Sequence, residues 1–218
     1  VAMHCAGIST LSLDGKPTRL LRAIRQYRPS ILHTHGYKAG IYGRLAARLC
    51  GIPAISTYHA GEVSSGRLAL YDWLDRQTSR LASKVFAVSP QIAKRLPVKS
   101  ELADNFVNTS DLNNSYGKQI AFVGRLSHEK GPDNFLQLAK CFPQQTFHIY
   151  GDGPMAAELQ HNAPPNLHFH GMQRDMSQVW PQVGLLIMPS RYEGLPMSAL
   201  EAMARGIPVL AHQVGALD

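Results

Sequence analysis

Residues 184–211, near the end of this 218-residue chain, constrain the fold more than any other stretch. They open with an apolar run at 184–188, which is short enough to be a buried strand and is ended by Pro189. Residues 195–205 then predict a helix, which a glycine ends, and residues 207–211 predict a second strand. A strand, a loop, a helix and a strand in this order indicate a parallel α/β unit. The N–H groups at the start of such a helix favour a bound phosphate.

Two glutamates, Glu193 and Glu201, stand eight residues apart in this stretch. Glu193 lies in the expected loop, and Glu201 lies about two turns farther on, inside the expected helix and among apolar neighbours. A carboxylate on a mostly apolar helix needs a hydrogen-bond partner. Carboxylates beside a phosphate-binding helix start can bind hydroxyl groups, so the combination suits a nucleotide sugar. Taken alone, the pair is better explained as a surface loop residue and a helix residue that the helix dipole favours.

Short apolar runs alternate with helical patterns along most of the chain. In the first half, strands are expected at 31–33, 52–58 and 84–88, and helices at 17–28, 37–50, 68–82 and 91–96. In the second half, further strands are expected at 120–123, 146–150 and 167–170, and helices at 132–141, 155–161 and 175–180. This alternation predicts right-handed βαβ units and parallel sheets.

A boundary is expected at residues 104–118, which are rich in Asn, Asp and Ser. Residues 1–116 hold 15 Lys and Arg against 7 Asp and Glu, which gives +8, and residues 117–218 hold 7 against 8, which gives −1. A basic half joined to a nearly neutral half indicates two domains with different partners. The prediction is a partial N-terminal domain at 1–108, a linker at 109–118 and a partial C-terminal domain at 119–218.

The composition argues against several classes of protein. No apolar run reaches the length of a membrane span, and the first residues lack the basic flank and apolar core of a signal peptide. Cys5, Cys50 and Cys141 are far apart and form no CxxC pair, so we expect reduced thiols in a cytoplasmic protein and no metal site. The sequence has no zinc-finger, RNA-binding or leucine-zipper signature, so nucleic acid is not an expected partner.

Three motifs together closely resemble the signature of the retaining GT-B glycosyltransferases of family 4. They are the Glu-x7-Glu pair with its flanking Pro-Ser and Ala-Arg-Gly-Ile-Pro-Val segments, residues 122–131, and residues 149–154. The resemblance extends from about Ile31 to the last residue. It implies an α/β fold of two Rossmann-like domains with parallel sheets, the GT-B arrangement. Family members begin with a strand and a glycine-rich loop that are not found before Pro17, and they continue past Asp218, so the resemblance also implies a fragment with both domains incomplete.

The resemblance further implies a nucleotide-sugar donor, linked to either UDP or GDP, with no metal ion and no other cofactor. Arg125 and Lys130 would neutralise the diphosphate, Glu193 would hold the sugar and Glu201 the ribose. His59 matches a family histidine that contacts the transferred sugar. The expected catalytic residues are therefore His59, Arg125, Lys130 and Glu193. The expected donor-binding residues are Gly124, Arg125, Lys130, Gly151, Gly153, Glu193, Gly194, Leu195, Met197, Ser198 and Glu201.

The same resemblance implies a retaining reaction. Both glutamates lie on the donor side of the sugar, so the leaving diphosphate, rather than a protein base, would take the acceptor proton. The expected acceptor is a glycan or a lipid-linked sugar in the synthesis of cell-surface polysaccharide or lipopolysaccharide. His33 and His35 also lie at a strand end and could face the site, but no third ligand stands near them, so they do not predict a metal.

The expected helix at 17–28 separates basic from apolar side chains. Its apolar side should face the core, and its basic side should face solvent, where it could contact anionic lipid headgroups. We therefore expect a cytoplasmic protein that attaches peripherally to the inner face of a membrane. The apolar set is Leu20, Leu21, Ile24 and Tyr27, and the basic set is Arg19, Arg22, Arg25 and Arg28.

Two alternative functions stay open. A nucleotide-sugar 2-epimerase on the same fold would carry its own acid–base carboxylates in the N-terminal domain, where Glu62 is the only acidic residue in the loop of His59. A truncated remnant would bind a nucleotide or a partner and transfer nothing.

Overall fold

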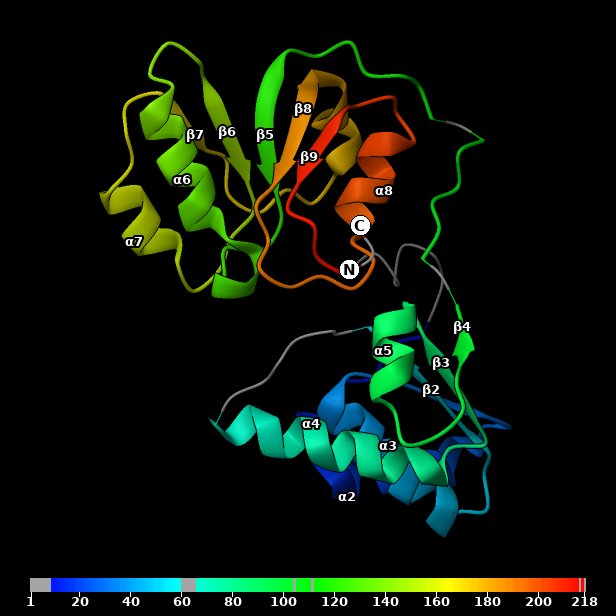
Figure 1. The fold of residues 1–218 in the computed structure, drawn as a ribbon. Coiled ribbons are helices and arrows are strands. Elements are labelled where there is room, and N and C mark those ends of the chain that lie inside the picture. The colour runs from blue at the N-terminus through cyan, green and yellow to red at the C-terminus, as the bar shows by residue number, and fades with distance from the viewer. Residues whose placement is uncertain (1–8, 60–65, 104, 111, 216, 218) are drawn as a thin grey trace. The chain divides into compact units, whose positions relative to one another are not determined.

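The computed structural model describes residues 9–59, 66–103, 105–110, 112–215 and 217. The chain forms two compact units, which divide between Leu102 and Ala103, and each unit has one parallel sheet (Figure 1). Cys50 and Cys141 are free thiols, and Cys5 lies outside the described residues. None of the helices within the described ranges is long and apolar enough to cross a membrane.

The N-terminal unit has four strands in the order β1-β2-β3-β4, all parallel. Its elements are α2 (Pro17–Tyr27), β1 (Leu32–His35), α3 (Tyr37–Leu49), β2 (Ala54–Tyr58), α4 (Gly66–Thr78), the 3₁₀ helix η1 (Ser79–Leu81), β3 (Lys84–Ala87), α5 (Pro90–Arg95) and β4 (Glu101–Leu102). Helix α3 packs against β1 and β2, and α2 and α4 both contact α3. Strand β4 was not predicted, because no apolar run marks its two residues; both are exposed in the structure.

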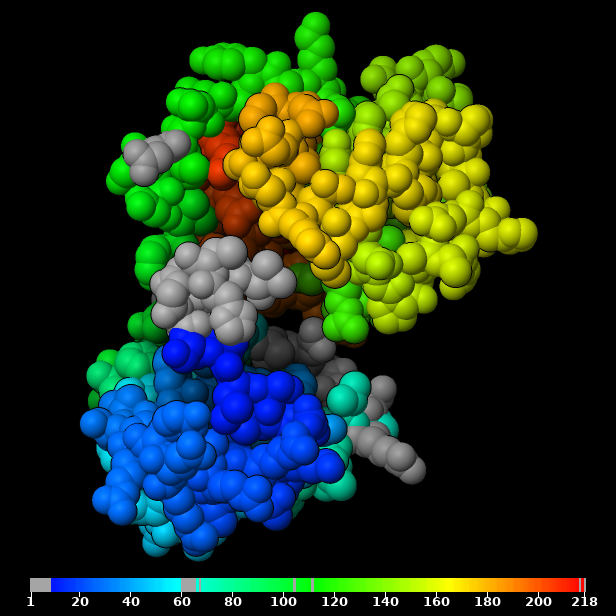
Figure 2. Space-filling model, turned by 180° about the vertical axis from the view of Figure 1, so that it is seen from behind, coloured from blue at the N-terminus to red at the C-terminus, as the bar shows by residue number. Residues whose placement is uncertain are grey.

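Helix α2 exposes its basic side, as predicted. Ile24 is buried on the opposite side, and Figure 2 shows α2, in dark blue, on the surface of its unit. The prediction that Tyr27 faces the core is wrong, since this side chain is 65% exposed. Tyr27 is the last helical residue, and the chain turns away at Arg28, whose backbone is left-handed with φ of 43°.

The C-terminal unit has five parallel strands in the order β7-β6-β5-β8-β9. Its elements are β5 (Gln119–Val123), η2 (His128–Lys130), α6 (Pro132–Cys141), β6 (Phe147–Tyr150), α7 (Ala156–His161), β7 (Leu167–Phe169), η3 (Met176–Gln178), η4 (Trp180–Gln182), β8 (Val183–Met188), α8 (Met197–Met203) and β9 (Val209–Ala211). Figure 1 shows α6 and α7 on one face of the sheet and α8 on the other. One apolar cluster, around Phe135 and Ile149, lies under α6 and α7, and a second, around Trp180 and Ala202, lies under α8.

Two predicted helices of this unit differ from the structure. The helix predicted at 195–205 begins only at Met197, because Pro196 has an extended backbone, with ψ of 128°, and forms the N-cap. The helix predicted at 175–180 is replaced by the two 3₁₀ turns η3 and η4. The segment predicted as a linker, 109–118, belongs to this unit, where Ser115 donates hydrogen bonds to the carbonyl groups of Arg205 and Val183.

The strand order of this unit reverses direction at β5. The chain passes from β5 outward to β6 and β7 and then returns to β8 on the other side of β5. Open parallel sheets bind ligands outside the carboxyl ends of the strands at such a reversal. A ligand site is therefore expected at the loops that follow β5, β6 and β8.

Candidate functional site

A cavity of about 620 Å³ opens at the carboxyl ends of β5 and β6. Four of the residues predicted to bind the donor line it: Gly124, Arg125, Gly151 and Gly153. The full lining is Val123, Gly124, Arg125, Tyr150, Gly151, Asp152, Gly153, Met172, Gln173 and Met176. The other six lining residues were not predicted to belong to a site.

Glycine is required where the loops after β5 and β6 meet. A Cβ atom on Gly151, whose φ is +148°, would lie 1.8 Å from the carbonyl oxygen of Gly124, and one on Gly153 would lie 2.4 Å from that of Leu126. The two loops are joined by main-chain hydrogen bonds, from Gly124 N to Tyr150 O and from Leu126 N to Asp152 O, each 3.0 Å. This part of the cavity wall is therefore backbone, which lets a ligand approach the main chain closely.

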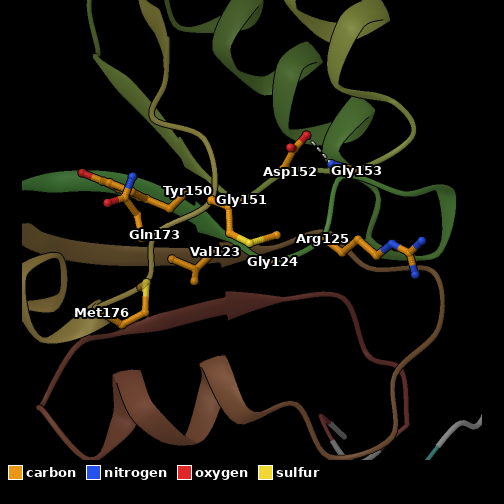
Figure 3. Close-up of a pocket in the computed structure, with 10 residues that line it drawn as sticks. Val123, Gly124, Arg125, Tyr150, Gly151, Asp152, Gly153, Gln173 and Met176 are labelled. Carbon is orange, nitrogen blue, oxygen red and sulfur yellow. Dashed lines mark hydrogen bonds between the residues drawn. The ribbon is translucent and has the colours of Figure 1, made fainter. Parts of the chain in front are cut away.

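The two ends of the cavity differ in chemistry. Figure 3 shows Arg125 at one end and Tyr150, Gln173 and Met176 at the other. Arg125 is exposed and can offer a planar, charged group of donors to a phosphate. The opposite end is lined by a thioether, an amide and Tyr150, which is only 5% exposed. This mainly apolar wall suits a flat heterocyclic base. The cavity thus has one region for an anion and another for a ring.

Lys130 and Glu193 form an ion pair. Both belong to the motifs that resemble the family signature, but neither lines the cavity. Lys130 Nζ lies 2.8 and 2.7 Å from the two carboxylate oxygens of Glu193, and Ser190 Oγ donates to the same carboxylate at 2.8 Å. The Glu193 side chain is only 3% exposed, whereas that of Lys130 is 30% exposed. Gly131 brings the η2 turn against the loop after β8, since a Cβ there would lie 2.1 Å from Pro189 O.

Arg191 anchors the loop after β8, a role that the sequence did not predict. Its guanidinium group binds both carboxylate oxygens of Asp133, at 2.8 and 2.6 Å, and also donates to the carbonyl group of His128 at 2.9 Å. The Arg191 hydrogen bond holds the pKa of Asp133 below its usual value. This anchor fixes the loop that carries Glu193. The sequence hint of such an anchor is Asp133, an acidic residue in the first turn of α6.

Glu201 has the hydrogen-bond partner that its place on an apolar helix required. Trp180 Nε1 donates to Glu201 Oε2 at 3.0 Å, and the guanidinium group of Arg205 lies 5.7 Å from the centre of the Trp180 ring. The remaining predicted donor-binding residues, Gly194, Leu195, Met197 and Ser198, lie in the loop and first turn of α8. They do not line the cavity, and Leu195 O accepts a hydrogen bond from Asn105.

The three histidines singled out in the N-terminal unit come together at the carboxyl ends of β1 and β2. His35 Nδ1 and His59 Nε2 share a hydrogen bond of 2.9 Å, and the rings of His33 and His35 lie 4.2 Å apart. Burial, followed by repulsion from His33, lowers the pKa of His59. Within the described residues, no group of three or more His, Cys, Asp or Glu side chains is arranged to hold a metal ion. Glu62 lies outside the described residues.

Two units with parallel sheets, one of which has a glycine-walled cavity at a strand-order reversal, define a Rossmann-like α/β protein. Residues 9–100 match the family model described as "Glycosyl transferase 4-like domain", and residues 117–218 match that described as "Glycosyl transferases group 1". The chain therefore belongs to the group 1 glycosyltransferases, which have the GT-B fold.

Characterised relatives agree with this assignment. The UDP-Gal:alpha-D-GlcNAc-diphosphoundecaprenol alpha-1,3-galactosyltransferase of Escherichia coli is 27% identical over 96% of this chain and 64% of its own length. The GDP-mannose-dependent alpha-mannosyltransferase of Mycobacterium tuberculosis is 30% identical over 95% of this chain and 62% of its own length. The structure of Anabaena HepE with UDP-glucose superposes with a TM-score of 0.79, at 19% identity, over 91% of this chain and 63% of that protein. The chain thus spans less than two thirds of each of these proteins.

Proposed function

We propose that this chain carries the donor site of a glycosyltransferase that takes a sugar from a nucleoside diphosphate. The observation that supports the proposal is the cavity of the C-terminal unit, with Arg125 at one end and an apolar, ring-binding end at the other. These two ends match the diphosphate and the base of a nucleotide. Relatives named for UDP-Gal and for GDP-mannose make both UDP and GDP reasonable donors.

In the proposed reaction, the bond between the anomeric carbon and the diphosphate breaks while the acceptor oxygen attacks the same face of the sugar. The leaving diphosphate oxygen takes the acceptor proton, and the configuration is retained. Arg125 and Lys130 would stabilise the charge that develops on the diphosphate. Glu193 would hold the sugar hydroxyls and Glu201 the ribose, while His59 of the N-terminal unit would contact the transferred sugar.

The Lys130–Glu193 ion pair bears on how a donor would be held. The two side chains bind each other. A donor would offer Lys130 a phosphate and Glu193 a hydroxyl group, so each side chain would exchange its partner for part of the same ligand. Glu193 keeps the hydrogen bond from Ser190 in either state, which limits the cost of the exchange.

The proposed acceptor is a glycan or a lipid-linked sugar in the synthesis of cell-surface polysaccharide. The printed name of the Escherichia coli relative describes an acceptor linked to diphosphoundecaprenol, and two further relatives from that species are named for O-antigen biosynthesis. The excess of positive charge in residues 1–116 would suit an acceptor or membrane surface that is anionic. No metal ion is proposed for the reaction.

Isothermal titration with UDP and with GDP tests the donor site. We expect one of the two nucleotides to bind. Arg125→Ala should lower the affinity for that nucleotide by at least about 10-fold, since a charged contact to phosphate contributes about 1.5–3 kcal/mol. Arg174→Ala is the matched control, because Arg174 is an exposed neighbour of Gln173 that does not line the cavity. Binding of neither nucleotide, or equal affinity in Arg125→Ala, would overturn the proposed site.

Incubation with nucleotide sugars separates the proposed transferase from its alternatives. Transfer of sugar to an added lipid-linked or glycan acceptor supports the proposal. Formation of an epimer without an acceptor indicates a 2-epimerase, and nucleotide binding without either product indicates a remnant.

A further inference from the structure

We infer that His170 is a positioning residue for the donor cavity, because its ring and its carbonyl group fix two of the residues that form the ring-binding end. These two residues are Tyr150 and Gln173. The inference rests on the proposed function, since it takes the cavity to be the donor site. His170 itself is not among the lining residues, so it would act through its neighbours.

The ring of His170 supports Tyr150. The two rings are stacked, with centroids 4.4 Å apart and planes 11° apart. His148 lies on β6, two residues before Tyr150, and its Nδ1 shares a hydrogen bond of 3.0 Å with His170 Nε2. Tyr150 is held at its other end by its hydroxyl group, which donates to Gln119 Oε1 at 2.6 Å. Tyr150 is 5% exposed, so its position is set by these contacts and by the core beneath it.

The hydrogen bond between the two histidines requires one ring nitrogen to accept, so at least the accepting ring must be neutral. Burial, and then the neighbouring histidines, lower the pKa of both His148 and His170. The lowered pKa values favour the neutral form of both rings, in which one nitrogen can donate and the other accept.

The main chain of His170 fixes Gln173, the second lining residue that it positions. Its N–H group donates to Ile149 O at 2.9 Å, and its carbonyl group accepts from Gln173 Nε2 at 2.7 Å. Gly171 then turns with φ of +67° and accepts a hydrogen bond from Gly151 N. The turn after His170 thus carries Gln173 to the cavity, where Figure 3 shows it near Tyr150.

Removing the His170 ring should loosen the ring-binding end and leave the phosphate end unchanged. Arg125 and the glycine turns have no contact with this ring among those described. His170→Ala should therefore weaken the binding of nucleoside and nucleotide alike, and it should not weaken the binding of pyrophosphate. Arg125→Ala should instead weaken the binding of nucleotide and of pyrophosphate and leave the binding of the nucleoside unchanged.

The test compares His170→Ala, His170→Phe and the control His168→Ala by isothermal titration. The probes are whichever of UDP and GDP the wild-type protein binds, the corresponding nucleoside, and pyrophosphate. We expect His170→Ala to lose about 3- to 10-fold in affinity for the nucleotide and the nucleoside, the range for one aromatic stacking contact. His170→Phe keeps a ring on Tyr150 and should stay within about 2-fold of wild type. In turnover, the donor KM should rise in His170→Ala and kcat should stay constant.

His168 is a matched control because it lies two residues earlier, is exposed, and does not stack on Tyr150. The inference is overturned if His170→Ala binds nucleotide as wild type does, if His170→Phe is as weak as His170→Ala, or if His168→Ala shows an equal loss. Absence of UDP and GDP binding in the wild-type protein would instead overturn the proposed function, and this inference with it.

Discussion

The two units of this chain share a parallel α/β plan but keep their charged pairs in different places. In the N-terminal unit, Arg44 and Asp75 meet at 2.5 Å inside the core, with side chains only 1% and 5% exposed. In the C-terminal unit, both faces of the sheet are covered by apolar clusters. Its pairs, Lys130 with Glu193 and Arg191 with Asp133, lie in loops at the carboxyl ends of the strands.

The position of a charged pair in this fold determines whether it can act on a ligand. A charge enclosed between helices and sheet can only hold the unit together, because no ligand can reach it. In the pair at the carboxyl edge, the Glu193 side chain is only 3% exposed but that of Lys130 is 30% exposed, so the lysine can exchange its protein partner for a ligand. Substitution of the enclosed Arg44 or Asp75 should therefore change the stability of the N-terminal unit, whereas substitution of Lys130 or Glu193 should change binding or catalysis in the C-terminal unit.

The buried pair of the N-terminal unit belongs to a larger hydrogen-bonded network. Arg44 also donates to Ser56 Oγ at 2.9 Å and to Thr78 Oγ1 at 2.7 Å, and Ser56 is linked to Thr34. The network joins β1, β2, α3 and α4, so it acts in place of apolar packing between these elements. Loss of one charge would leave its partner buried and uncompensated.

The largest expected effect is on stability, in Asp75→Ala. Breaking a buried ion pair costs about 3–5 kcal/mol, because the remaining guanidinium group of Arg44 is enclosed. The control is Asp14→Ala, whose carboxylate pairs with Arg19 at the surface, where both side chains are about half exposed. Such a pair contributes about 0–1 kcal/mol. The measurement is urea denaturation followed by far-UV circular dichroism, with nucleotide affinity measured on the folded protein.

We expect Asp75→Ala to lower the free energy of unfolding without changing the nucleotide affinity of the folded C-terminal unit. If Asp75→Ala costs no more than Asp14→Ala, the buried pair does not hold the N-terminal unit together. The contrast between the two units would then be wrong.

The second-largest expected effect is on catalysis and concerns the Lys130–Glu193 pair of the C-terminal unit. Lys130→Ala and Glu193→Ala should each lower kcat by about 10²-fold, the effect of losing one charged or polar stabiliser in a site that excludes water. Their stabilities should differ. Lys130→Ala leaves a buried carboxylate with only Ser190 as its partner, at a cost of about 1–3 kcal/mol, whereas Glu193→Ala leaves a lysine that water can reach.

Steady-state kinetics and thermal unfolding of the same two variants provide the measurement. A fall in stability without a fall in kcat would make this pair structural, like the pair of Arg44 and Asp75. Glu201→Ala is a useful comparison, because a ribose contact acts in ground and transition states alike and should mainly raise the donor KM.

The contrast between the units also explains which features could be predicted from the sequence. The prediction of two parallel sheets is confirmed, and it could be made because apolar runs and glycine turns are local signals. The GT-B fold is also confirmed, but it was implied by the family resemblance of the motifs. The hydrogen bond of Glu201 was expected, because a carboxylate on an apolar helix needs a partner. Arg44 was not expected to be buried, since an arginine in a helix normally points to solvent and its partner is 31 residues away.

The candidate site was predictable to a similar degree. Gly124 and Gly151 follow apolar strands, which places them at the carboxyl edge, and they line one cavity. The roles of the residues around them stay predictions. The Lys130–Glu193 pair and the ring stack on Tyr150 depend on contacts between distant segments, so no local pattern could indicate them.

The smallest expected effect concerns the exposed face of the N-terminal unit. Arg19, Arg22, Arg25 and Arg28 of α2 and its C-cap are all exposed, so this face could attach the protein weakly to anionic lipid. Each cation near such a surface contributes about 1 kcal/mol. Arg19 already forms an ion pair with Asp14 and should contribute less than the others. Arg19→Gln should therefore weaken attachment less than Arg22→Gln, and the fourfold Gln variant should weaken it most.

Co-sedimentation with liposomes measures this attachment. Binding should require anionic lipid and should fall as salt rises, because surface charges are screened within about 10 Å at 0.1 M salt. The four substitutions lie on the solvent side of α2, so stability and nucleotide affinity should stay unchanged, in contrast to Asp75→Ala and Lys130→Ala. Equal binding to neutral liposomes, or none to anionic liposomes at low salt, would refute the attachment. The basic charge of this unit would then be better assigned to a soluble, anionic acceptor.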